Sequence, residues 1–143
     1  EVELKEFSIL YLIINNLHVF EKRIELLSEL KLYTEICVDF LNKIIDFLSS
    51  NKTFETNTLK EKFKQTKYLS LINDISALAP VKFITEIKKN DDEILLIFDE
   101  INNDLKKFEL NQKIDNLEKK MIQNMNEETY KELLDLKRQA NNG

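Results

Sequence analysis

The side chains of this sequence best suited to covalent chemistry are a single cysteine, Cys37, and a single histidine, His18. They could act as nucleophile and base only if the fold brought them together, and no third group that would orient the histidine is indicated. Because Cys37 lies on an apolar stripe of helical spacing, we expect it to be a small core residue. We expect His18 to end or cap the first helix. One cysteine cannot form an internal disulfide or a cysteine-based zinc site, which favours a reducing compartment.

Carboxylates are numerous, and their densest group is Asp91-Asp92-Glu93. This group could hold a cation, but it directly follows Asn90. An asparagine cap followed by acids at the positive end of the helix dipole is typical of a helix start. The sequence has no Glu-x-x-His motif, so the ligands of a di-iron helical bundle are missing. We therefore expect no catalytic residue, no metal and no cofactor in this chain.

The densest basic cluster consists of Lys60, Lys62, Lys64 and Lys67. It could contact phosphate, and the two-helix unit 59–79 has roughly the spacing of a helix-turn-helix. However, the unit has no turn glycine and no arginine for base edges. Residues 1–80 carry a net charge of −2 and residues 81–143 a net charge of −3. We therefore expect a solvated lysine face and no direct binding of duplex DNA.

The composition predicts an all-α fold. The chain has 143 residues, of which 43% are hydrophobic and 33% charged, so it can bury a core. Gly143 and Pro80 are its only glycine and proline, whereas sandwiches and barrels need many such turn residues. The longest strongly apolar run, Ile9–Ile14, is far shorter than the ~20 residues of a membrane span. Since the sequence begins at Glu1 without a methionine, we expect it to be a piece of a longer protein.

Residues 1–90 predict a bundle of five or six helices. The expected helices are 4–16, 20–30, 33–48, a short one from 58, 68–79 and one from 80. The first is apolar almost all round, which is typical of a helix at the centre of a bundle. Thr58 and Glu61 match a capping box, and Pro80 can occupy the first position of the next helix. Asn15 and Asn16 are expected to stop the first helix.

After Asn90 the helical pattern continues to about Met125 without glycine or proline. About 32 residues span roughly 48 Å, which is too long for one wall of a small bundle. We expect the first half to pack on the bundle, through the stripe Ile94, Ile97, Ile101, Leu105 and Phe108, and the second half to project. A last helix to about Ala140 folds back as a helical hairpin. This divides the chain into a bundle subdomain, 1–90, and a long linking helix with a C-terminal helical hairpin, 91–143.

The hairpin has more apolar residues than the narrow contact between its two helices, which we call the seam, can bury. We expect Ile122, Met125, Tyr130 and Leu134 to remain partly exposed, beside the cations of Lys131, Lys137 and Arg138. Exposed apolar groups with a charged rim are typical of a surface that binds another protein. The alternative is that the same residues join two copies of the chain in a coiled-coil dimer.

The order of these features resembles the C-terminal helicase-binding domain of bacterial DNA primase of the DnaG type. Residues 7–27 resemble the opening of that family, two leucine-rich helices around an Asn-His-Pro break, although residues 16–20 read Asn-Leu-His-Val-Phe without the proline. Residues 40–71 follow its leucine spacing. The ending at 126–137, Asn-Glu-Glu-Thr-Tyr-Lys-Glu-Leu-Leu-Asp-Leu-Lys, resembles its closing helix. The resemblance covers nearly the whole chain.

The resemblance implies a non-catalytic adaptor that recruits primase to the replicative DNA helicase and modulates that helicase. Its hairpin would dock on the N-terminal domain of the helicase, in the bacterial cytoplasm at the replisome. The nucleotidyltransferase modules of the parent primase would lie upstream. We expect a monomer, with a dimer as the alternative. Carried over by position, the docking residues are Met121, Ile122, Met125, Tyr130, Leu133, Leu134, Lys137 and Arg138.

Overall fold

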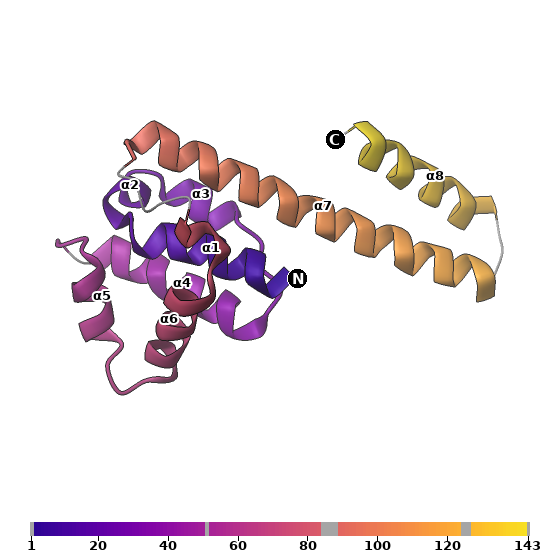
Figure 1. The fold of residues 1–143 in the computed structure, drawn as a ribbon. Helices are drawn as coiled ribbons and strands as arrows, with labels where there is room; N and C mark the ends of the chain where they lie inside the picture. The colour runs from indigo at the N-terminus through magenta and orange to yellow at the C-terminus, as the bar shows by residue number, and fades with distance from the viewer. Residues whose placement is uncertain (1, 51, 84–88, 124–126, 143) are drawn as a thin grey trace. The chain divides into compact units, whose positions relative to one another are not determined.

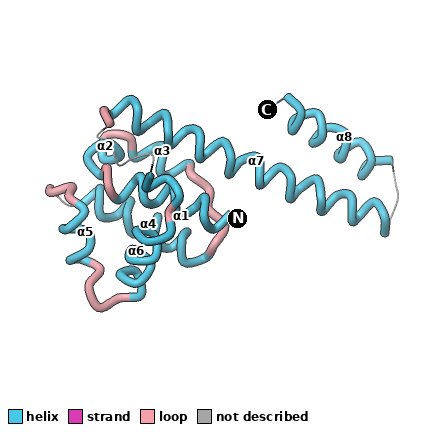
Figure 2. The backbone as a smooth tube through the Cα atoms, in the orientation of Figure 1, coloured by secondary structure: helices cyan, strands magenta, loops and turns pink. Residues whose placement is uncertain are grey.

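The computed structural model describes residues 2–50, 52–83, 89–123 and 127–142, and this part of the chain is helical, without a strand (Figures 1 and 2). The predicted all-α class, a multi-helix bundle followed by a long helix and a C-terminal hairpin, is confirmed. The described elements are α1 (Val2–Ile14), α2 (Leu17–Glu21), α3 (Ile24–Glu29), α4 (Glu35–Ser50), α5 (Thr56–Lys62), α6 (Lys67–Leu78), the 3₁₀ helix η1 (Pro80–Phe83), α7 (Asp91–Gln123) and α8 (Glu127–Asn142). They form two compact units, Glu1–Asn102 and Asn103–Gly143.

Helix α1 is the central element of the first unit, as its apolar sequence predicts. It contacts α2, α4, α6 and η1, which lie around it in Figure 1. Its core residues are Phe7, Ile9, Leu10, Leu12, Ile13 and Ile14. Each such side chain contributes about 1.5–3 kcal/mol when it leaves water. The helix ends at Ile14, where the side-chain amides of two asparagines satisfy carbonyls of its last turn. Asn15 Nδ2 donates to the carbonyl of Tyr11, and Asn16 Nδ2 donates to that of Leu12, both at 2.9 Å.

One polar side chain, Glu6, lies in the middle of this apolar helix and is fully buried. The backbone N–H of Tyr33 donates to its Oε2 at 2.5 Å. Thr34 donates to the same carboxylate with its N–H at 3.2 Å and with its hydroxyl at 2.5 Å. These donors directly precede α4, where helix amides have no partner within the helix. Glu6 therefore joins the start of α4 to the middle of α1, a role that no sequence pattern indicates.

The single helix expected over residues 20–30 is wrong, because the chain forms two short helices, α2 and α3. The break falls at Arg23, whose φ is −132°. On one side of it, Phe20 packs its ring on Phe98 of α7, with the ring centroids 5.2 Å apart. On the other side, Leu27 faces α4. Residues on the two sides of the break thus pack on different helices, a tertiary effect that the periodicity of the sequence does not register.

The capping box expected at Thr58 and Glu61 is also wrong. Helix α5 begins two residues earlier, and no side chain caps its N-terminus. Instead, the hydroxyl of Thr56 donates to the carbonyl of Ile14 at 2.6 Å, which joins the start of α5 to the end of α1. Pro80 begins η1 as expected. The remainder of the helix expected there, with Ile84 and Ile87, lies outside the described residues.

Helix α7 begins where the sequence predicts, and its cap involves Glu93 as well as the predicted Asn90. The N–H of Glu93 donates to Asn90 Oδ1 at 2.9 Å, and Glu93 Oε1 accepts from the Asn90 N–H at 3.2 Å. This is a reciprocal capping box. In the first unit the buried residues of α7 are Ile94 and Phe98, so Phe98 takes the core position that the expected stripe gave to Ile97. The first unit ends at Asn102, three turns into α7, whereas the sequence division falls at the start of this helix, at residue 90.

Candidate protein-docking surface

The catalytic pair that the residue types allow, His18 and Cys37, has unsuitable surroundings in the described structure. Cys37 is fully buried in α4, and burial, followed by the nearby Glu6 and Glu3 carboxylates, raises the pKa of its thiol to about 12. A nucleophilic cysteine needs the opposite, a depressed pKa and access to substrate. The expectation that His18 ends or caps the first helix is wrong, because α1 already ends at Ile14. It lies in α2, with its Nε2 3.7 Å from Asp91 Oδ1, and both side chains are exposed.

We predict that iodoacetamide alkylates Cys37 very slowly in the folded protein. At pH 8 the thiolate fraction at a pKa of about 12 is about 1000-fold lower than at the ordinary 9.0, before burial slows access further. Unfolding in urea should restore the ordinary rate, which mass spectrometry would follow. Equal alkylation rates in the folded and unfolded protein would contradict the burial of Cys37.

The same thiol affects stability at high pH. Because it ionises first in the unfolded chain, it lowers the free energy of unfolding as pH rises from about 9 toward about 12, and it has no such effect below pH 9.

No cluster of three or more His, Cys, Asp or Glu side chains suited to a metal ion occurs among the described residues. A search of the same residues finds no helix with the length and apolarity needed to cross a membrane.

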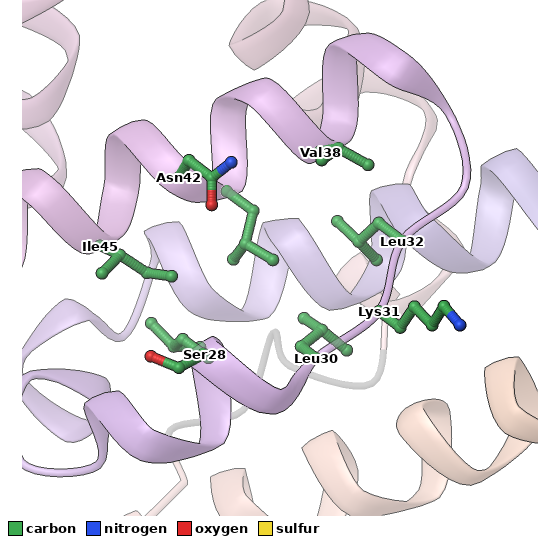
Figure 3. Close-up of a pocket in the computed structure, with 9 residues that line it drawn as sticks. Ser28, Leu30, Lys31, Leu32, Val38, Asn42 and Ile45 are labelled. Carbon is green, nitrogen blue, oxygen red and sulfur yellow. The ribbon is translucent and has the colours of Figure 1, made fainter.

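A groove that the sequence does not indicate lies between α3 and α4 (Figure 3). Its volume is about 370 Å³, and the apolar part of its lining consists of Leu27, Leu30, Leu32, Val38, Leu41 and Ile45. Its polar residues are Ser28, Asn42 and Lys31. The Ser28 hydroxyl donates to the carbonyl of Ile24 within α3. With one ionisable lining residue, the groove has no pair of groups for acid–base chemistry.

In the second unit, α8 runs back along the second half of α7, and the two helices form the predicted hairpin (Figure 1). The seam contains Ile114 of α7 and Leu133 of α8, which are 9% and 4% exposed. Across it, Lys137 Nζ lies 3.0 Å from Glu118 Oε1. Glu118 was not among the predicted site residues, since only the antiparallel register of the hairpin brings it beside Lys137.

The hairpin leaves its largest exposed apolar side chains near the turn. Ile122, next to the last residue of α7, is 84% exposed, and Tyr130, in the first turn of α8, is 49% exposed. Met121 and Leu134 are half-buried. Tyr130 and Leu134 are four residues apart on α8 and therefore share one face of it. We call Met121, Ile122, Tyr130 and Leu134 the hairpin-tip residues. Met125 lies outside the described residues.

The other three predicted docking residues have partners within the hairpin. Leu133 is buried in the seam, so it supports the hairpin rather than forming its surface. Lys137 pairs with Glu118, and Arg138 Nη1 lies 3.7 Å from Asp135 Oδ1. Residues 103–143 carry eight basic and eight acidic groups, a net charge of zero. Charge therefore gives this unit little long-range attraction for a partner, and the exposed apolar area is its distinctive feature.

No protein-family model matches this chain, and neither a curated protein nor a solved structure matches it. The resemblance to primase therefore depends on the sequence segments quoted above.

Proposed function

We propose that this chain is the helicase-binding domain of a bacterial DNA primase, a non-catalytic adaptor that brings primase to the replicative helicase at the fork in the cytoplasm. The hairpin-tip residues would contact the N-terminal domain of the helicase. The observation that carries the proposal is the exposure of two large apolar side chains, Ile122 and Tyr130, at one end of the hairpin. The quoted resemblance of residues 126–137 to the closing helix of that domain supports it independently.

The chemistry of the hairpin tip suits a protein partner. Tyrosine combines a large apolar ring with a hydroxyl that can form a hydrogen bond, and it is enriched among the residues that dominate binding energy. Methionine adapts its shape to an irregular partner surface. The ion pairs Lys137–Glu118 and Lys131–Glu127 are more than 40% exposed, so they contribute little to affinity and more to orientation.

The test is calorimetric titration of the chain into the replicative helicase from its source organism, or into the isolated N-terminal domain of that helicase. We predict micromolar or tighter binding. Tyr130→Ala should weaken it about 10- to 30-fold, the effect of losing about 1.4–2 kcal/mol at a binding hot spot, and Leu134→Ala about tenfold.

Leu78→Ala is the matched control, since it removes an apolar side chain that is 57% exposed but lies in the first unit. The affinity of this variant for the helicase should equal that of the parent chain. Circular dichroism would establish that each variant is as helical as the parent chain. A folded sample that does not bind the helicase would refute the proposal.

The alternative is a structural module in which the same hairpin-tip residues join two copies of the chain. The 84% exposure of Ile122 is compatible with it. Sedimentation equilibrium separates the two proposals. A dimer that Tyr130→Ala dissociates, together with no helicase binding, would favour the structural module.

A further inference from the structure

The described structure also carries a strongly basic segment that the proposed function does not use. Residues 60–67 contain four lysines and one glutamate, a net charge of +3 in eight residues. The remaining residues of 1–102 carry 9 basic and 17 acidic groups, a net charge of −8. The densest positive segment of the first unit therefore spans the end of α5, the turn after it and the start of α6. We call Lys60, Lys62, Lys64 and Lys67 the lysine patch.

The ammonium groups of the lysine patch are mostly available to a ligand. Lys62, Lys64 and Lys67 are exposed, and Lys60 is half-buried. The carboxylate of Glu61 lies next to the patch, with its Oε1 3.9 Å from Lys64 Nζ and both side chains more than 60% exposed. At that distance and exposure the attraction is weak, so an incoming phosphate can compete with it.

Aromatic rings hold two of these lysines in place. Lys62 Nζ lies 5.5 Å from the centre of the Phe47 ring, and Lys67 Nζ lies 5.4 Å from the centre of the Tyr68 ring. Cation–π attraction at these distances orders the charged group without neutralising it. Lys64 lies in the turn between α5 and α6, where Gln65 takes a left-handed conformation with φ of 64°. This backbone geometry replaces the turn glycine that the sequence lacks.

We propose that the lysine patch binds the phosphate backbone of single-stranded DNA. Four cations within eight residues, on both sides of α5 and in the turn after it, suit a flexible strand, whose phosphates can adjust to them. A duplex is stiff, so it cannot curve to bring several phosphates to so short a segment, and the rest of the unit, with a net charge of −8, offers it no general attraction. The Tyr68 ring stacks on Phe40 with centroids 5.8 Å apart and carries Lys67, so it is not free to stack on a base. Binding should therefore show little preference for base sequence.

The test is fluorescence anisotropy of a labelled oligo(dT) strand of about 20 nucleotides with the full chain, with a duplex of equal length as the second probe. Three or four phosphate contacts predict a salt slope near −2 to −3, so affinity should fall about 20- to 50-fold between about 50 and 200 mM salt. Replacing all four lysines with glutamine should abolish measurable binding. Because that variant could lose stability, Lys64→Gln alone, at an exposed position, should reduce the salt slope by about 0.7.

The matched control replaces four exposed lysines of α7, Lys106, Lys107, Lys119 and Lys120, with glutamine, which changes the net charge equally. It should bind oligo(dT) better than the patch variant by at least tenfold. Equal loss in the two variants, or tighter binding of the duplex than of oligo(dT), would each overturn the proposal. Helicase binding by the patch variant should be unchanged, so failure here and failure of the proposed adaptor function are distinguishable.

Discussion

Replacing Glu6 with alanine should lower the free energy of unfolding by about 3 kcal/mol, since removing a buried acceptor strands donors that have no water to replace it. Three donors converge on this carboxylate, the N–H groups of Tyr33 and Thr34 and the hydroxyl of Thr34. A loss of this size is a large share of the 5–15 kcal/mol that holds most domains folded. Urea denaturation followed by circular dichroism would measure it.

Glu3→Ala is the control for Glu6. It removes an exposed carboxylate from the same helix and should change the free energy of unfolding by less than about 0.5 kcal/mol. Glu6→Gln should fall between the two, because it keeps one acceptor oxygen and the shape of the side chain. Equal effects of Glu6→Ala and Glu3→Ala would show that the buried hydrogen bonds do not stabilise this fold.

Phe98→Ala should have an effect of similar size, about 3–5 kcal/mol, because it leaves a cavity in the core of the first unit. Phe98 is fully buried, and its ring packs on the equally buried ring of Phe20. Thermal unfolding of the variant, measured in parallel with urea denaturation, would give the loss.

Leu96→Ala serves as the comparison for Phe98, since Leu96 lies two residues earlier on α7 and is 61% exposed. Its loss should stay below about 1 kcal/mol. A Phe98→Ala variant as stable as Leu96→Ala would mean that α7 does not pack on the bundle through this residue.

The helices were the most predictable part of the molecule. The all-round apolar pattern of α1, the asparagine stop after it and the Asn90 cap of α7 all depend on neighbours within a few residues in sequence, and each is confirmed. The errors have a common cause. The break at Arg23, the early start of α5 at Thr56 and the burial of Phe98 depend on residues 40 or more positions away or on other helices, which periodicity does not register.

The candidate site was predictable to a lesser degree. The exposure of Ile122 and Tyr130 agrees with the thin seam expected from the sequence. The pairing of Lys137 with Glu118 depends on the register of two helices. The three hydrogen bonds to Glu6 come from residues 27 and 28 positions away in the sequence. Neither has a local signature, since a glutamate on an exposed helix face and one in a core read identically in sequence.

The central position of α1 also has a consequence for synthesis of the protein. Helix α1 precedes α2, α4, α6 and η1, which contact it, and η1 begins 66 residues after α1 ends. While a ribosome is still translating α2 to α6, a nearly all-apolar segment is exposed with no core to enter. Such a nascent segment is a natural binding site for a chaperone, and at slow translation it is the part of the chain most prone to aggregate.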